Sequence, residues 1–212
     1  MSHMPVSNSE ETTRLFKSDF LEFFSHISPV TITVIWLPVA LYFLVRAILD
    51  TVAGAPAWII PAGLLAGLLV WSFAEYNLHR YLFHYPPKGA AQERIVYLFH
   101  GVHHAYPQDK TRLVMPPVVA IPLALIFFFL FQLVIVRLFN APLWFAPVFT
   151  GFIFGYLAYD LTHYATHHFP MRSGYFKFIK RYHMQHHYKT PEKRFGVSSP
   201  LWDFVYNTYP KD

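Results

Sequence analysis

Four stretches of the chain are almost wholly apolar, and each has about the length that a helix needs to cross a bilayer. A hydrocarbon core about 30 Å thick requires about 20 such residues, because a helix rises about 1.5 Å per residue. The stretches cover about residues 30–49, 58–77, 116–136 and 143–161, and the second ends in polar residues. The sequence therefore predicts an all-α integral membrane protein with four transmembrane helices.

The composition favours lipid over water as the surroundings of these helices. The chain is 54% hydrophobic and 19% aromatic, and only 14% of its residues are charged. The alternative, a soluble protein with four buried helices, would need polar helix faces that these stretches lack. There is no cysteine, which excludes disulfides, thiolate zinc sites and cysteine nucleophiles.

The chain is expected to contain a short tail and a single domain. Residues 1–15 form the tail, whose opening "MSHM" is typical of a cloning scar, so His3 is set aside. Residues 16–212 form the domain. It begins with "SDFLEFFSHI", which predicts an amphipathic helix at the membrane interface with Ser18 or Asp19 as its N-cap.

The basic residues predict how the helices are oriented in the membrane. The turns at 50–57 and 137–142 follow odd-numbered spans and therefore lie on one side, and only Arg46 and Arg137 of the 17 Lys and Arg residues lie near them. Because Lys and Arg accumulate on the cytoplasmic side, both termini and the 80–115 connection are expected to be cytoplasmic. The net charge of +5 then reflects membrane topology, and no nucleic-acid partner is expected.

Histidines gather at the predicted cytoplasmic ends of the second and fourth spans. Of 13 histidines, His3 and His26 stand apart, and the others form the groups "HRYLFH", "HGVHH", "HYATHH" and "HMQHH". A lone histidine near a membrane end is usually a hydrogen-bonding residue. Four groups on one side, with none on the other, predict a metal centre in a cytoplasmic helical cap.

The spacings indicate two metal ions. Residues three or four apart share a helix face, whereas adjacent ones such as His103 and His104 diverge by about 100° and suit two ions. The five-residue separation in "HRYLFH" fits two different metals or a helix that ends between the histidines. About ten histidines exceed the three or four ligands of a zinc site, so two metals with about five nitrogens each are expected. Imidazole suits iron, zinc, copper and nickel, and without a Glu-x-x-His pair the centre is not a carboxylate di-iron bundle.

The chain resembles the fatty acid hydroxylase superfamily of membrane di-metal enzymes, and within it the fatty acid 2-hydroxylases. The resemblance extends from about Phe16 to Tyr209. It rests on "EYNLHRYLFHYPP", "FHGVHHAYPQDKTRLVMPP", "YDLTHYATHHFP", "YHMQHHYK" and "FGVSSPLWDFVYNT". The histidine groups indicate only the superfamily, whereas "HHAYPQDKTRLVMPP" and "GVSSPLWD" narrow the resemblance to the 2-hydroxylases.

The resemblance implies an activity, a cofactor and a ligand set. The activity is O2-dependent hydroxylation of carbon 2 of a fatty acyl chain, either free or in a ceramide-type lipid, at two iron ions that zinc can replace in a purified sample. The implied ligands are His79, His84, His100, His103, His104, His163, His167, His183, His186 and His187. His168 is extra to the pattern and is left out.

Many eukaryotic relatives carry a cytochrome b5 domain ahead of the membrane part, and here only about fifteen residues precede the similarity. The expected electron donor is therefore a separate cytochrome b5- or ferredoxin-like protein with its reductase. The expected location is a bacterial inner membrane, or the endoplasmic reticulum if the source is eukaryotic.

Two carboxylates and two basic residues are candidates for supporting roles. Asp160 precedes His163 by three residues and Glu75 precedes His79 by four, so either can be a hydrogen-bond partner of a ligand. The alternative is a carboxylate at a helix end that faces water. Lys110 and Arg112 are candidates for contact with a lipid headgroup or an acyl carboxylate, or they belong to a solvated basic loop.

Two other functions are considered. A sterol or carotenoid oxygenase of the same superfamily would share the histidine groups, although the stretches between the groups favour a 2-hydroxylase. A membrane metal transporter would place polar ligands near the bilayer midplane. The interiors of the first and third spans offer only Thr33 and Gln132, which disfavours transport.

Overall fold

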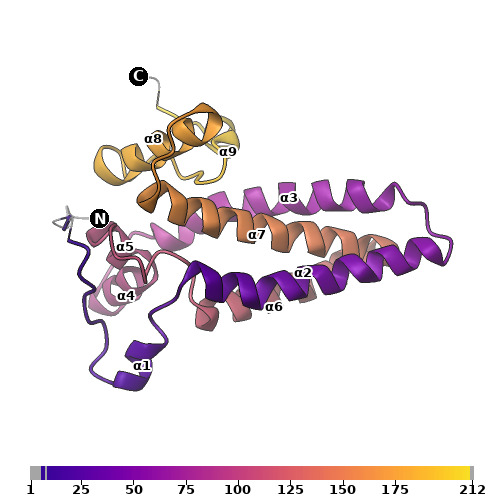
Figure 1. Ribbon diagram of the computed structural model, residues 1–212, viewed down its shortest axis with the longest axis horizontal. Coiled ribbons are helices and arrows are strands. Elements are labelled where there is room, and N and C mark those ends of the chain that lie inside the picture. The colour runs from indigo at the N-terminus through magenta and orange to yellow at the C-terminus, as the bar shows by residue number, and fades with distance from the viewer. Residues whose placement is uncertain (1–5, 8, 211–212) are drawn as a thin grey trace. The chain divides into compact units, whose positions relative to one another are not determined.

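The computed structural model describes residues 6–7 and 9–210, and all regular elements in this part of the chain are helical. Four helices are long and apolar enough to cross a membrane, which confirms the predicted fold class. They are α2 (Pro29–Val52), α3 (Ile59–Asn77) continued by η1 (Leu78–Phe83), α6 (Pro117–Phe131) continued by η3 (Gln132–Leu138), and η4 (Pro142–Trp144) continued by α7 (Phe145–His168). Figure 1 labels α2, α3, α6 and α7, and its colours follow the residue number.

The chain divides into two compact units. One comprises Val30–Trp71 and Met115–Ala158, and we call it the membrane unit. The other comprises Met1–Pro29, Ser72–Val114 and Tyr159–Asp212, and we call it the histidine unit. Helices α3 and α7 each begin in the membrane unit and end in the histidine unit.

The second and fourth spans are longer than the apolar pattern suggests. The second was expected to end near residue 77 and the fourth near residue 161, whereas helical structure continues to Phe83 and to His168. The polar residues beyond the apolar stretches include the "HRYLFH" and "HYATHH" groups. The added turns place His79, His163 and His167 in helices. As a result, His163 and His167, which are four residues apart, share a helix face.

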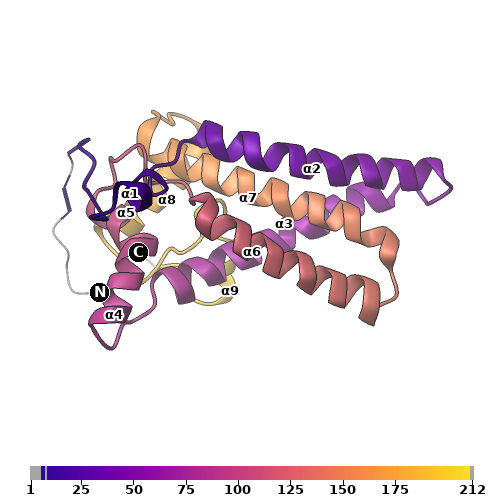
Figure 2. The same ribbon diagram turned by 90° about the horizontal axis from the view of Figure 1, so that it is seen from below.

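In the membrane unit the four helices run alongside one another (Figures 1 and 2). Helices α3 and α7 approach so closely that a Cβ atom on Gly67 would lie 2.1 Å from the Val148 carbonyl oxygen. A Cβ on Gly151 would lie 2.2 Å from the Leu64 carbonyl oxygen. Small residues at such crossings are typical of membrane helices, whose association depends on close van der Waals contact.

We predict that Gly67→Ala destabilises the protein although alanine is the better helix former by about 1 kcal/mol. The added methyl group would collide with backbone atoms of α7, which cannot rotate away, so we expect a net loss of about 1–3 kcal/mol. Thermal unfolding in detergent measures the effect. Gly89→Ala is the control, because nothing lies within 4 Å of a Cβ there. Equal stability of the two variants would contradict the close packing.

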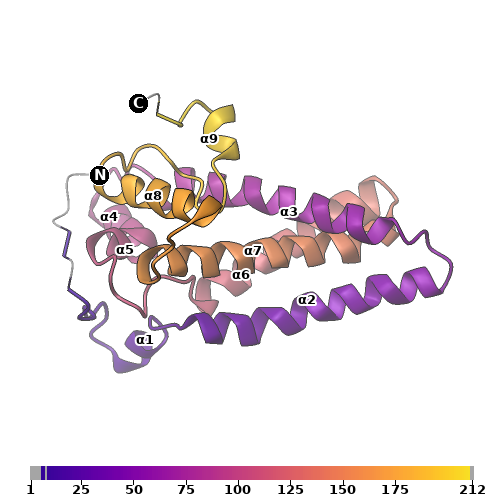
Figure 3. The ribbon, with the colours of Figure 1, turned by 45° about the horizontal axis from the view of Figure 1, so that its top comes forward.

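The remaining helices belong to the histidine unit. They are α1 (Asp19–Phe23), α4 (Ala90–Val96), η2 (Tyr97–Gly101), α5 (Val102–Ala105), α8 (Gly174–Tyr188) and α9 (Leu201–Val205). Figure 3 shows α9 close to α8. Ser18 caps α1, since its hydroxyl accepts a hydrogen bond from the Leu21 N–H, which agrees with the sequence prediction.

Arg112 ties the N-terminal segment to the loop that follows α5. Its side chain is buried and forms a 2.6 Å ion pair with Glu22. It also donates hydrogen bonds to the Thr13 carbonyl and the Ser25 hydroxyl, both at 2.7 Å. The solvated-loop interpretation of Arg112 is therefore wrong, whereas its contact with a lipid headgroup or an acyl carboxylate stays a prediction. A buried guanidinium needs several acceptors, and the N-terminal segment supplies them. Lys110 instead forms an exposed ion pair with Glu10 at 2.9 Å.

We predict that this attachment weakens in acid. Burial alone would raise the pKa of the Glu22 carboxyl, but the Phe16 and Leu15 N–H groups and the Arg112 guanidinium outweigh it and lower the pKa to about 2. Because the pKa is depressed on folding, the stabilisation is complete above the ordinary value of about 4.5 and is lost as the pH falls from there towards 2. Hydrogen exchange of residues 13–27 should speed up over that range. In Glu22→Gln the pH dependence should vanish, and its persistence would assign it to another group.

Candidate metal centre

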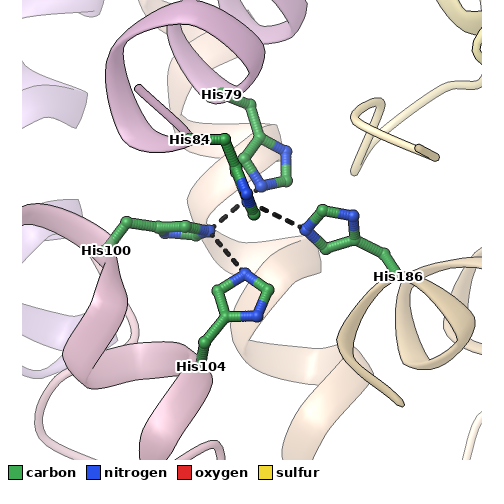
Figure 4. Close-up of side chains that lie close together, drawn as sticks. All are labelled: His79, His84, His100, His104 and His186. Atoms are coloured by element: carbon green, nitrogen blue, oxygen red, sulfur yellow. Dashed lines mark hydrogen bonds between the residues drawn. The ribbon is translucent and has the colours of Figure 1, made fainter. Parts of the chain in front are cut away.

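Ten histidines converge into two groups of five within the histidine unit. The first group consists of His79, His84, His100, His104 and His186, and Figure 4 shows their rings directed towards a common centre. The second group consists of His103, His163, His167, His183 and His187. In each group, one ring nitrogen from every histidine lies within 4.8 Å of the others. These are the ten histidines that the family resemblance implies as ligands, with five for each expected ion.

Helical geometry explains the division into two groups. His103 and His104 are adjacent and lie in different groups, as are His186 and His187. Neighbours on a helix diverge by about 100°, so each pair directs its side chains to two centres. The pairs separated by four residues stay together because they share a helix face. They are His100 with His104, His163 with His167, and His183 with His187.

The structure contradicts one of the two interpretations of the "HRYLFH" group, namely that its two histidines bind different metals. His79 and His84 belong to the same group, not to two metals. The segment Leu78–Phe83 is a π-helix, and the His84 N–H donates to the His79 carbonyl oxygen at 3.1 Å. This i→i+5 pattern, which is frequent at functional sites, brings residues five apart onto one face. The other interpretation, a helix that ends between the two histidines, agrees with the structure, since His84 follows the last helical residue.

The spacing of the nitrogen atoms fits a metal ion at the centre of each group. In the first group, the His100 Nε2 atom lies 3.1 Å from that of His79 and 3.0 Å from that of His104. In the second group, the His183 Nε2 atom lies 3.0 Å from that of His167 and 3.1 Å from that of His187. Two nitrogens at right angles around a metal, each about 2.1 Å from it, are about 3.0 Å apart. The groups therefore have the dimensions of coordination shells.

The two groups are neighbours and are shielded from water. The rings of His104 and His187, one from each group, stack with centroids 4.2 Å apart. Nine of the ten histidines are buried, and His84 is partly exposed. Burial lowers the pKa of His104 to about 3, and it lowers the pKa of His100, His103 and His183 well below their ordinary value. These rings are therefore neutral at physiological pH, the form that binds a metal.

The remaining candidate residues lie around the groups. Glu75 and Asp160 are buried, with exposed fractions of 4% and 1%, so the alternative of a water-facing carboxylate is wrong for both. Glu75 accepts hydrogen bonds from the N–H groups of Val197 and Ser198 at 2.8 and 2.7 Å. His168 lies outside both groups and is partly exposed, with its ring 4.6 Å from that of Tyr164.

The sequence did not indicate two backbone carbonyls that contact the first group. The His79 Nδ1 atom lies 2.5 Å from the Phe195 carbonyl oxygen, and the His186 Nδ1 atom lies 2.6 Å from the Lys193 carbonyl oxygen. Such bonds fix the orientation of a ligand ring. Every residue has a backbone carbonyl, so the sequence cannot show which carbonyls contact a ligand. The one sequence signal for this loop was the "FGVSSPLWD" stretch, which contains part of it.

The chain is similar to known hydroxylases in both sequence and structure. The sequence model of the fatty acid hydroxylase family matches residues 64–208. The chain is 37% identical to a dihydroceramide fatty acyl 2-hydroxylase of Arabidopsis thaliana over 98% of this chain and 84% of that protein. It is 34% identical to the fatty acid 2-hydroxylase of Mus musculus over 97% of this chain and 58% of that protein. A solved structure of full-length scs7p, in which only the hydroxylase domain is visible, matches with a TM-score of 0.80 and 34% identity, covering 91% of this chain and 70% of that one.

Proposed function

Because this chain belongs to the fatty acid hydroxylase family, we infer that it hydroxylates carbon 2 of a fatty acyl chain in a sphingolipid-type lipid. Relatives that are named as 2-hydroxylases of fatty acids or of dihydroceramide fatty acyl chains are similar over nearly its whole length. The observation that carries the inference is the pair of five-histidine groups in a protein with this similarity. The same similarity favours an acyl substrate over the ring lipids of a sterol or carotenoid oxygenase.

We propose that each histidine group holds one iron ion. Among the described residues, both groups consist only of histidine, so the ligands are neutral and the ions keep most of their positive charge. Histidine nitrogens are ligands that iron accepts, and each group would supply five of them. When bound, the iron pair supplies the activation of O2 and the removal of a C–H hydrogen. The chain supplies neutral ligands in fixed positions and a buried site.

The stoichiometry requires an electron donor. Insertion of one oxygen atom into a C–H bond consumes O2, two electrons and two protons, and the second oxygen atom leaves as water. The acyl chain gives up two electrons when its C–H bond becomes C–OH, and the four-electron reduction of O2 needs two more from a donor. We propose that a separate cytochrome b5- or ferredoxin-like protein, with its reductase, delivers them.

An apolar pocket in the membrane unit suits the hydrocarbon tail of the substrate. Its lining is largely aromatic and aliphatic, and includes Trp36, Leu123, Phe127, Phe152 and Ile153. Pockets for flexible apolar ligands are lined in this way, with few polar groups. We propose that apolar side chains of the membrane unit, these among them, line the path of the acyl tail.

We propose that the histidine unit faces the cytoplasm, because the N-terminal segment, the 80–115 connection and the C-terminal tail carry most of the Lys and Arg residues. The chain has no cysteine, so single-cysteine variants report sidedness without background. In right-side-out vesicles, a membrane-impermeant maleimide should label Gly54→Cys and leave Gly89→Cys unlabelled. The reverse pattern would overturn the orientation.

The lipid profile of a host that expresses the chain tests the function. A new 2-hydroxy fatty acid in hydrolysed lipids is expected with the unaltered sequence and not with His103→Ala, which removes one nitrogen from the second group. An altered sterol or carotenoid, with unchanged acyl chains, would replace the proposal with the ring-lipid oxygenase.

A further inference from the structure

The loop from Lys193 to Ser198 is the part of the molecule that contacts two histidines of the first group through its backbone. The carbonyl oxygens of Lys193 and Phe195 accept hydrogen bonds from the Nδ1 atoms of His186 and His79. Each bond fixes the tautomer, since Nδ1 carries the proton and Nε2 is left free to bind a metal. The position of this loop therefore determines where two of the five Nε2 atoms lie.

Asp203 holds the first half of the loop. Its Oδ1 atom accepts the Phe195 N–H at 2.9 Å, and its Oδ2 atom accepts the Gly196 N–H at 2.8 Å. The Thr208 hydroxyl donates to Oδ1 at 2.7 Å. Asp203 is fully buried, where a carboxylate is stable only if its oxygens receive several hydrogen bonds.

Glu75 holds the second half of the loop. Its Oε1 atom accepts the N–H groups of Val197 and Ser198, and its Oε2 atom accepts the Ser198 hydroxyl. Four consecutive backbone N–H groups, from Phe195 to Ser198, thus donate to two buried carboxylates. The loop is too tight for a side chain at Gly196, where a Cβ would lie 2.0 Å from the Ser199 carbonyl oxygen.

The second histidine group lacks this arrangement. The Nδ1 atoms of four of its histidines, His103, His167, His183 and His187, are buried, and in the described part of the chain they form no hydrogen bond with another protein group. His163 differs, because the Leu113 backbone lies within hydrogen-bonding reach of its ring. The two groups have the same ligand type and number but differ in how firmly the surrounding backbone orients the rings. Oriented ligands bind a metal more tightly than free ones.

We propose that Asp203 is a positioning residue for the first metal ion, acting through the Lys193–Ser198 loop on His79 and His186. The inference rests on the proposed function, since it assumes that both groups bind iron. It makes the two sites unequal, with a first site that depends on the loop and a second site that does not.

Two isosteric substitutions separate loop geometry from charge. Asp203→Asn places an amide NH2 against one of the two backbone N–H donors, whichever way the amide is turned, so one loop bond is lost and two donors face each other. Glu75→Gln keeps an amide oxygen for both backbone N–H groups, and its NH2 can donate to the Ser198 hydroxyl, which rotates to accept. Both changes remove one negative charge, but only Asp203→Asn disturbs the loop.

Chelator competition with ferrous iron, read as metal bound per chain in the purified full-length protein, is the test. We expect Asp203→Asn to lower the affinity for one of the two ions by about 10- to 100-fold and to leave the affinity for the other unchanged. Glu75→Gln should bind both ions as tightly as the unaltered chain does. In a His79→Ala background, Asp203→Asn should add less than its full effect, because only His186 remains for the loop to orient, whereas in a His167→Ala background it should add its full effect.

Several results would overturn the proposal. Retention of both ions by Asp203→Asn would show that the loop does not position the ligands. Equal losses in both carboxylate variants would assign the effect to charge, and equal weakening of both ions would assign it to general loss of structure. If Asp203→Asn does not fold, Thr208→Val removes the hydroxyl bonds to Asp203 and to Tyr76, and unchanged binding of both ions in that variant would also reject the inference. An unaltered chain that binds no metal would overturn the proposed function together with this inference.

Discussion

Replacement of His167 by alanine is expected to abolish hydroxylation, whereas replacement of its neighbour His168 is expected to leave most of it. His167 belongs to the second group, with its Nε2 atom 3.0 Å from that of His183. Its loss removes one of five nitrogens, and we expect activity to fall by more than about 100-fold, because changes to outer partners of metal ligands already cost about 10- to 100-fold. His168 lies outside both groups, and its ring contacts Tyr164.

The two variants differ by one position on the same helix, so each is the other's control. Metal content and thermal stability should follow activity, because a bound ion stabilises the folded state by mass action. His168→Ala should keep two metal ions per chain and change stability by less than about 1 kcal/mol, as is usual away from buried networks. If both substitutions are silent, the second group does not hold a metal. If both abolish activity, His168 has a role that the two groups of five omit.

The second large effect concerns the identity of the metal. Nitrogen ligands bind zinc at least as tightly as ferrous iron in the usual affinity order, so a zinc-loaded protein should be as stable as the iron-loaded one. Zinc has no second accessible oxidation state, and we therefore expect no hydroxylated product from it. Product formation by both samples, each with reductant and lipid, is measured by mass spectrometry. Turnover by the zinc protein, after residual iron has been excluded by elemental analysis, would refute a redox role for the metals.

The sequence predicted the elements whose pattern is local. The four apolar stretches became helices near their expected positions, because bilayer thickness sets a length that is visible in the residues. The division of adjacent histidines such as His103 and His104 between two centres likewise agrees with helical geometry, whereas residues three apart, such as His100 and His103, were expected on one face and lie in different groups. The agreements needed only the rise and turn of a helix.

Features that depend on tertiary contacts were not predictable in the same way. The π-helix at Leu78–Phe83 brought His79 and His84 to one centre, although an α-helix would separate them. Arg112 was read as a surface residue because nothing near it in the sequence shows that Glu22, ninety positions away, is its partner. Nothing near Glu75 in the sequence shows that it accepts hydrogen bonds from Val197 and Ser198, more than 120 positions away.

The fate of isotopically labelled O2 tests the central claim most directly. Iron-loaded protein, supplied with an electron donor, its reductase and a ceramide-type lipid under heavy-oxygen gas, should yield acyl chains that carry one heavy oxygen atom at carbon 2. The product should be absent when the reductant is omitted and when His167→Ala replaces the unaltered chain. A hydroxyl group whose oxygen comes from water, or one placed at another carbon, would contradict the account.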